Sequence, residues 1–358
     1  MPEPLKNLYT KEKIKSVASQ LNKIYNKFEM NSFMDDIFNS KWNKFELKER
    51  MRHITHALIK YLPDNFKESS VIVDKTAIHF KGFEFMFFPE FIELKGLKHF
   101  KSSMQILENI TEYSSAEFAV RPFIKKYQDK TMKTLLKWSS HKNEHVRRLA
   151  SEGCRPRLPW AMALPEFKKD PSPILPILEN LKNDKSEYVR RSVANNLNDI
   201  SKDNPCFTID ISRSWINKCN NTDWIVKHGC RTLLKQGNLD VLLLFGYSES
   251  KDLKIKKLTY SKNVKLGDYL FFDFEIVSIR KLGLLRLEYA IYFKKKNGKL
   301  SKKVFKISEM KVNDNIKKVA KKHSFKIITT RVYYLGEHQL SIIANGKEFK
   351  PVSFKLIS

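Results

Sequence analysis

The sequence predicts an α-helical repeat solenoid followed by a small all-β sandwich. Three observations predict this order. Apolar residues recur every three or four positions up to about residue 245, they alternate with polar residues from about residue 254, and one motif of the helical half returns at intervals of about 40 residues. Because 358 residues exceed a single small domain, we expect two domains, at residues 1–250 and 251–358.

The first helix illustrates the helical pattern. Ile14, Val17, Leu21, Ile24 and Phe28 are spaced by three or four residues, which places them on one face of a helix. Similar spacing continues through most of the first 245 residues. We therefore expect a series of helices that pack through apolar stripes.

A repeated motif organises these helices. Glu-His-Val-Arg-Arg-Leu-Ala at 144–150 returns as Glu-Tyr-Val-Arg-Arg-Ser-Val at 187–193, and a degenerate copy, Asp-Trp-Ile-Val-Lys-His-Gly, follows at 223–229. Periods near 40 residues are typical of HEAT-like repeats, in which each helix pair buries its apolar stripe against its neighbours. The sequence therefore predicts a HEAT-like solenoid with a concave face.

The repeat helix has a core side and a cationic flank. At about 100° per residue, Val146, Leu149 and Ala150 share the core side, and Arg148 and Glu152 lie on another flank. Stacked repeats then present a column of cations that suits a phosphate backbone. The column comprises Arg148, Arg191 and Lys227, with Glu152, Asn195 and Arg231 one turn along.

Glu152 is the acidic exception in this column, and two interpretations stay open. One is an i,i+4 ion pair with Arg148, which contributes only about 0.2–0.5 kcal/mol on an exposed helix. The other is a carboxylate that acts on something cationic, because a carboxylate beside docked phosphates weakens DNA binding. The next segment, Cys-Arg-Pro-Arg-Leu-Pro-Trp at 154–160, favours the second. Its prolines end the helix, and its loop brings cations and an aromatic ring close to the carboxylate.

From about residue 254 the sequence predicts strands. Short β-branched and aromatic runs are separated by turn signals, and Asn345-Gly346 between two of them is typical of a type I′ hairpin. Such runs over about 105 residues fit an immunoglobulin-like β-sandwich. They lie at 269–277, 285–293, 304–307, 325–333, 339–344 and 349–356.

The charge of the chain predicts a polyanionic partner. Lys and Arg number 67 against 39 Asp and Glu, a formal net charge of +28. Residues 251–358 alone carry 26 basic and 9 acidic residues, a net charge of +17. Clustered cations on a folded protein favour nucleic acid. For the sandwich, a solubilising surface and a second contact to the same polyanion both remain open.

Other function classes lack support. The longest run without a charged residue is about nine residues, whereas a membrane span needs about 20, and the N-terminus lacks a secretory signal. We expect a monomer in the cytoplasm, associated with the nucleoid. The four cysteines and the histidine pairs lack the spacing of a complete metal site, and Walker, GxGxxG and GxSxG motifs are missing. We therefore expect neither metal nor cofactor.

One stretch resembles a known family. Trp-Ser-Ser-His-Lys-Asn-Glu-His-Val-Arg-Arg-Leu-Ala-Ser-Glu-Gly at 138–153, continued by Arg-Pro-Arg-Leu-Pro-Trp at 155–160, resembles the AlkC-type DNA alkylation-repair glycosylases. The basic sandwich is similar to the immunoglobulin-like extension of some members. The resemblance implies a monofunctional enzyme that hydrolyses the N-glycosidic bond of cationic N-methylated bases, such as 3-methyladenine and 3-methylcytosine, in double-stranded DNA. It also implies that the base stays largely stacked.

The resemblance also implies site residues. Glu152, in Ser-Glu-Gly-Cys-Arg-Pro-Arg, and Glu117, in Ser-Ser-Ala-Glu-Phe-Ala-Val-Arg-Pro, match the family's active-site carboxylates. The alternative, a non-catalytic HEAT-repeat scaffold that binds nucleic acid, explains the charge and the repeats but not Glu152. From the family's lesion-side positions and the cations of the repeats, the predicted DNA-binding residues are Arg148, Arg155, Arg157, Trp160, Arg190, Arg191, Lys227 and Arg231.

Overall fold

The chain consists of a helical unit and a mainly β unit. The computed structural model describes residues 3–247, 251–328 and 331–358. It divides into two compact units, Met1–Gly229 and Cys230–Ser358. The predicted domain boundary at 250/251 adjoins residues 248–250, which lie outside the described residues, so this boundary stays a prediction.

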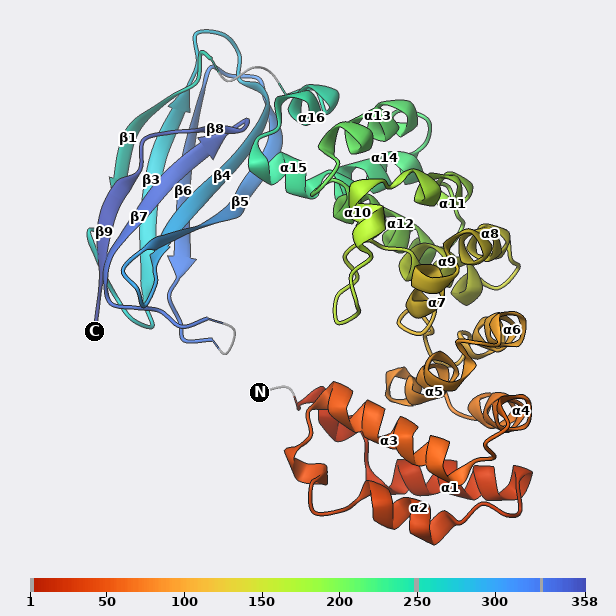
Figure 1. The fold of residues 1–358 in the computed structure, drawn as a ribbon. Helices are drawn as coiled ribbons and strands as arrows, with labels where there is room; N and C mark the ends of the chain where they lie inside the picture. Colours follow the sequence, from red (N-terminus) through yellow and green to blue (C-terminus); the bar gives the residue numbers. More distant parts are fainter. Residues whose placement is uncertain (1–2, 248–250, 329–330) are drawn as a thin grey trace. The chain divides into compact units, whose positions relative to one another are not determined.

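The first unit is a stack of helices in chain order (Figure 1). Its α-helices are α1 (Lys11–Ile24), α2 (Met30–Ile37), α3 (Leu47–Tyr61), α4 (Phe66–Ala77), α5 (Phe87–Gly96), α6 (Phe100–Ile110), α7 (Arg121–Lys126), α8 (Gln128–Trp138), α9 (Glu144–Gly153), α10 (Pro165–Lys169), α11 (Leu175–Leu181), α12 (Glu187–Ile200), α13 (Pro205–Trp215) and α14 (Asn220–Gly229). Short 3₁₀ helices lie at Leu5–Leu8, Trp42–Lys44, Phe83–Phe85 and Ser172–Ile174. Because α9 packs between α8 and α12, and α12 packs on α14, the predicted repeat array is confirmed.

The repeated motif marks equivalent helices. Its three copies lie in α9, α12 and α14. Val146, Leu149 and Ala150 are at most 2% exposed, which confirms the predicted core side. The side chain of Asn143 caps the first turn of α9, and the helix ends at Gly153, shortly before the prolines of the following loop.

The second unit begins with two helices and continues as two sheets (Figure 1). Its elements are α15 (Arg231–Gln236), α16 (Leu239–Leu244), β1 (Lys254–Tyr260), β2 (Asn263–Lys265), β3 (Tyr269–Val277), β4 (Gly283–Lys294), β5 (Leu300–Val312), β6 (Ile316–Ser324), β7 (Gly336–Ala344), β8 (Lys347–Glu348) and β9 (Val352–Ile357). One sheet has the order β1-β3-β6 and the other β2-β9-β7-β4-β5, with β8 on β7. Both sheets contribute to one apolar core, including Phe272, Phe274 and Leu340. The predicted immunoglobulin-like sandwich is confirmed.

The predicted Asn345-Gly346 turn is present and serves a second purpose. Both residues have positive φ angles, 44° and 79°, as a type I′ turn requires. Gly346 also lies against Gly237 at the end of α15, so close that a Cβ on Gly237 would stand 2.8 Å from the Gly346 carbonyl oxygen. The hairpin turn therefore packs directly on the α15–α16 connection.

The strand prediction was wrong at 325–333. Phe325–Ile328 and residues 331–333 form no strand apart from an isolated bridge between Ile328 and Arg331, and residues 329–330 lie outside the described residues. Phe325 is buried, but Ile327 is 78% and Val332 is 71% exposed, and no strand pairs with the described residues of this segment. Apolar content alone was misleading here.

Two Lys-rich strands were missed for the opposite reason. β1 and β6 are the edges of the three-stranded sheet, and lysines interrupt their apolar alternation. Lysine on edge strands is a common protection against pairing with other chains.

Among the described residues, no helix has the length and apolar character to cross a membrane.

Candidate active site

Polar side chains from three segments of the first unit form a hydrogen-bonded cluster. One segment precedes α7, the second is α9 with the residues that follow it, and the third is α12. We call this group the carboxylate cluster. It comprises Ser115, Glu117, Arg148, Glu152, Arg155, Ser192 and Asp199.

Arg148 lies between the two predicted catalytic carboxylates. Its Nη1 donates to Ser115 Oγ at 3.0 Å and to Glu117 Oε2 at 3.3 Å. Its Nη2 lies 3.6 Å from Glu152 Oε1. The Arg148 guanidinium also stacks over the ring of Tyr188, 4.7 Å from its centroid. Tyr188 belongs to α12, so this helix also contacts Arg148. The two carboxylates are thus brought to one cation.

Glu152 is engaged through both oxygens. Oε1 accepts from Arg155 Nη1 at 2.7 Å and Oε2 accepts from Ser192 Oγ at 2.7 Å. Arg155 in turn donates through Nε to Asp199 Oδ2 at 2.8 Å. Glu152 is only 5% exposed. The i,i+4 pair with Arg148 therefore exists. It joins a half-buried arginine to a buried carboxylate, so the small energy of an exposed pair does not apply to it.

Burial also changes the titration of the other carboxylate. The pKa of Glu117 is raised, chiefly because burial disfavours its charged form; Arg148 opposes this and the nearby Glu152 adds to it. Grouping buried charges is costly for stability unless their geometry is good. A buried carboxylate with a perturbed pKa beside a specific partner is the pattern expected of a functional site.

The loop after α9 has a defined form. Its Arg157 pairs with Asp203 through two hydrogen bonds of 2.7 and 2.5 Å. Trp160 is 56% exposed and adopts a φ of 64°, in the left-handed region that non-glycine residues rarely occupy. Its carbonyl oxygen accepts from Lys48 Nζ of α3 at 2.7 Å. The loop therefore presents an indole ring at the surface, 6.1 Å between centroids from the Phe83 ring.

Comparisons with known proteins place this chain. Residues 97–211 match the model of the DNA alkylation repair enzyme family, and residues 254–358 match the C-terminal Ig-like domain of the uncharacterised protein YhaZ. The chain is similar to alkylpurine DNA glycosylase AlkC of Pseudomonas fluorescens, solved bound to DNA containing an abasic site analog. The identity is 32% and the TM-score 0.93, over 99% of this chain and 100% of that one. The chain belongs to the AlkC-type DNA alkylation repair family.

A second relative carries no described activity. The uncharacterized protein YhaZ of Bacillus subtilis is 46% identical over 354 residues, which are 98% of this chain and 99% of that protein. Both matches extend over the helical and the β parts of this chain, so these two relatives share its two-part organisation. The carboxylate cluster lies inside the segment 97–211 that matches the repair-enzyme model.

Arg190 has a structural task in its repeat. Its Nη1 donates to the carbonyls of Asp184 and Lys185 at 2.7 and 3.0 Å. Arg147, at the equivalent position of α9, likewise donates to two carbonyls of the loop before its helix. The first arginine of the motif therefore stabilises the preceding loop through hydrogen bonds to its backbone. A DNA contact by Arg190 stays a prediction.

The other predicted DNA-binding residues occupy different surroundings. Arg191 is exposed and pairs with Glu187 at 2.6 Å, an interaction that water keeps weak. Lys227 is exposed on α14, whereas Arg231 is the first residue of α15 and belongs to the second unit. Their roles in DNA binding also stay predictions.

Sequence reasoning missed three of the seven cluster residues, Ser115, Ser192 and Asp199. Asp199 lies 44 residues from its partner Arg155, and Ser192 lies 40 residues from Glu152. Ser192 follows Arg191 in the repeated motif, which was a usable signal. No local pattern pointed to Asp199, because its contact depends on how α12 packs against the end of α9.

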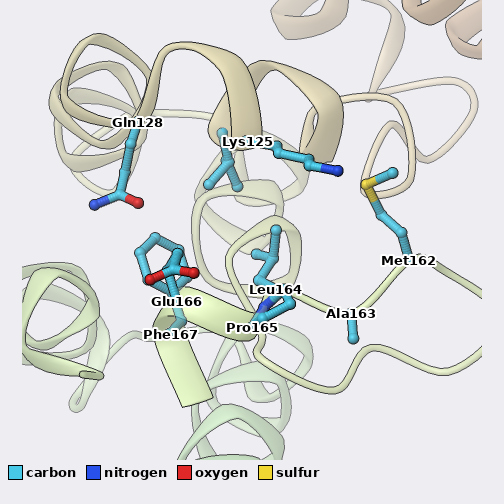
Figure 2. A pocket seen from close by; sticks show the side chains of 9 residues that line it. Lys125, Gln128, Met162, Ala163, Leu164, Pro165, Glu166 and Phe167 are labelled. Atoms are coloured by element: carbon cyan, nitrogen blue, oxygen red, sulfur yellow. The ribbon is translucent and has the colours of Figure 1, made fainter. Parts of the chain in front are cut away.

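A separate apolar cavity of about 180 Å³ lies behind the loop. Figure 2 shows side chains of Met162, Leu164 and Phe167 facing Lys125 of α7 and Gln128 of α8. None of the cluster residues lines it.

Within the described ranges, no group of three or more His, Cys, Asp or Glu side chains is arranged to hold a metal ion.

Proposed function

We propose that this protein is a monofunctional DNA glycosylase that releases cationic N-methylated bases, of the 3-methyladenine and 3-methylcytosine type, from double-stranded DNA. One observation carries the proposal. Glu117 and Glu152 meet at Arg148 in a cluster of buried and half-buried side chains. This occurs in a chain that is similar over its whole length to a protein described as an alkylpurine DNA glycosylase.

The cluster suits the chemistry of a charged leaving group. A methylated cationic base departs without protonation, so the barrier lies in the oxocarbenium character of the deoxyribose. Carboxylates stabilise that cation and orient or deprotonate the attacking water, as in glycosidases. A neutral base would lack this advantage, because the proposed site supplies no general acid.

The two carboxylates have different roles in this proposal. Glu152 is fixed at both oxygens by Arg155 and Ser192, which suits a preorganised negative charge facing the developing cation. Glu117 has a raised pKa, which suits the group that accepts the proton of the attacking water. The products are the free base and an abasic site, since water rather than an amine is the nucleophile.

We also propose that the damaged base stays largely stacked, and that one chain is sufficient. The apolar cavity of about 180 Å³ is lined by none of the cluster residues. A base extruded into that cavity would therefore not lie against the proposed catalytic carboxylates. All residues of the cluster come from a single chain. Fluorescence of 2-aminopurine placed at the position of the damaged base should stay low on binding, whereas extrusion of that base would raise it strongly.

The decisive experiment offers duplex DNA with different bases to the purified protein. We expect release of 3-methyladenine and 3-methylcytosine, with abasic sites that break only after alkali treatment. Uracil and 8-oxoguanine should remain, and chelators should have no effect. Release of uracil would contradict the mechanism. DNA binding without any release would identify the non-catalytic scaffold instead.

A further inference from the structure

A buried arginine outside the carboxylate cluster joins two of its segments. Arg121 is the first residue of α7, four residues after Glu117, and is 0% exposed. Its Nε donates to the carbonyl of Met162 at 2.7 Å. Its Nη1 donates to the carbonyls of Gly153 and Arg155, both at 2.9 Å. One side chain thus donates hydrogen bonds to three backbone carbonyl oxygens at the two ends of one loop.

These bonds close the loop that follows Glu152. Gly153 is the last residue of α9, where carbonyls lack helical partners, and Met162 lies at the far end of the loop. A second closure joins the amide nitrogen of Leu164 to the carbonyl of Pro156 at 3.1 Å. Arg121 therefore lies at the neck of a compact loop, residues 154–161, which carries Arg155 and Trp160.

Holding the loop together with the buried charge of Arg121 costs free energy. Burial lowers the pKa of the Arg121 guanidinium to about 10, so it stays charged at neutral pH. Its Nη2 is buried without a hydrogen-bond partner. Both features cost free energy. A buried polar group that is incompletely satisfied calls for an explanation beyond packing.

A backbone contact brings the same two segments together. A Cβ on Gly153 would lie 2.5 Å from Val120 Cγ1, closer than real Cβ contacts allow. The residue next to Glu152 therefore packs without a side chain against the residue before Arg121. This contact and the Arg121 hydrogen bonds are independent, and both hold the segment that carries Glu117 against the end of α9.

We propose that Arg121 is a positioning residue of the active site, which sets the placement of Glu117 relative to Glu152 and the shape of loop 154–161. The inference rests on the proposed function. Arg121 touches no reacting atom; it acts through the backbone of Gly153, Arg155 and Met162. A displacement of about 1 Å at a reacting group can cost about 100-fold in rate, so this placement matters more than the stability of the loop.

Arg121→Lys tests the inference, with Arg147→Lys as the matched control. Lysine keeps the charge but lacks the fork that reaches three carbonyls. Arg147 is also buried and also donates to two backbone carbonyls, besides Asp184, at the other end of α9. Three quantities are measured for each variant: the single-turnover rate constant of 3-methyladenine release, the Kd for duplex DNA, and the Tm.

We expect Arg121→Lys to lose about 100-fold in the rate constant with a nearly unchanged Kd. Arg147→Lys should lose Tm to a similar extent but keep the rate constant. Equal rate losses in the two variants, or a wild-type rate in Arg121→Lys, would overturn the inference. Wild-type protein that releases no base would instead overturn the proposed function, so the two failures are distinguishable.

A second pair of variants decides the matter if Arg121→Lys does not fold. Gly153→Ala forces its new Cβ against Val120 and should slow release by about tenfold or more. Adding Val120→Ala removes the obstructing Cγ1 and should restore most of the rate. A slow double variant, or a Gly153→Ala variant at the wild-type rate, would show that the separation of these segments does not control catalysis.

Discussion

At the scale of single residues, positive and negative side chains alternate through the carboxylate cluster. Arg148 contacts Glu117 and Glu152, and Arg155 contacts Glu152 and Asp199. Each interior member therefore has two oppositely charged neighbours. Removing one charge leaves its neighbours buried and partly unpaired, which is costly. Conservative amide substitutions are consequently the cleanest probes of this site.

Glu152→Gln should retain DNA binding and lose about 100-fold or more in base release, because the amide removes the negative charge that faces the developing cation in the proposed mechanism. Glu117→Gln should show a loss of similar kind. Single-turnover release and Kd measured side by side check this. Near wild-type release by both variants would refute the assignment, and weaker binding at an unchanged rate would identify a structural ion pair.

The acid side of the pH–rate profile should report Glu117. Its pKa is raised above the ordinary value of 4.5 by burial and by Glu152, and the proposed mechanism needs the ionised form. The rate of release should therefore fall, as the pH is lowered, at a pH above 4.5. Glu117→Gln should have a low rate without this inflection. The same inflection in Glu117→Gln would assign it to another group.

At the scale of elements, β6 brings a histidine into the aromatic core of the sandwich. The ring of His323 lies 4.6 Å from Phe305 and 5.2 Å from Phe325, measured between centroids. Its Nδ1 is hydrogen-bonded to the Tyr289 hydroxyl at 2.8 Å. An imidazole in such a position is buried as the neutral form, which links the stability of the second unit to pH.

The second unit should lose stability between about pH 6.5 and about pH 4. Burial, with Arg331 and Lys303, lowers the folded-state pKa of His323 from 6.5 to about 4. In this window the unfolded chain binds more protons, so the free energy of unfolding falls as the pH falls, by roughly 3 kcal/mol at most, and levels off below it. Urea unfolding followed by circular dichroism measures this slope.

The control for that slope is Tyr289→Phe with His323→Phe, which removes the titrating ring and its hydroxyl partner together. The double variant should show a shallower dependence on pH over the same window. His338 has a pKa that burial also lowers, so a smaller slope of the same sign should remain. An unchanged slope in the double variant would exclude His323 as its source.

At the scale of the whole molecule, the net charge of +28 is unevenly distributed, with +17 in residues 251–358. Several of these cations lie on β6, an edge strand. Two explanations compete: contact with DNA phosphates, and protection of the edge against pairing with another chain. They predict different consequences when the charges are removed.

Replacing Lys318, Lys321 and Lys322, all exposed, with Gln should flatten the dependence of log K on log salt if the sandwich grips DNA. Each lost phosphate contact contributes about 0.9 to that slope, so the change is at most about 2.7. Sequence preference should not change, since such contacts read no bases. An unaltered slope accompanied by self-association of the variant would support edge protection instead.

The sequence by itself determined the order of the two parts, the repeat helices and the Asn345-Gly346 turn. These depend on contacts between residues a few positions apart, so spacing along the chain encodes them. The family motifs around Glu117 and Glu152 likewise singled out the two carboxylates that meet at Arg148. Strand 325–333 failed because a strand exists only when another one pairs with it.

Only the tertiary structure decided how these carboxylates are held. Arg148 reaches Glu117 across 31 positions, Ser192 reaches Glu152 across 40, and Arg155 reaches Asp199 across 44. Such contacts arise when helices pack and bury charges that must then find partners, and no local periodicity records them. The same holds for Arg121, whose sequence neighbours give no sign that three carbonyls of a distant loop depend on it.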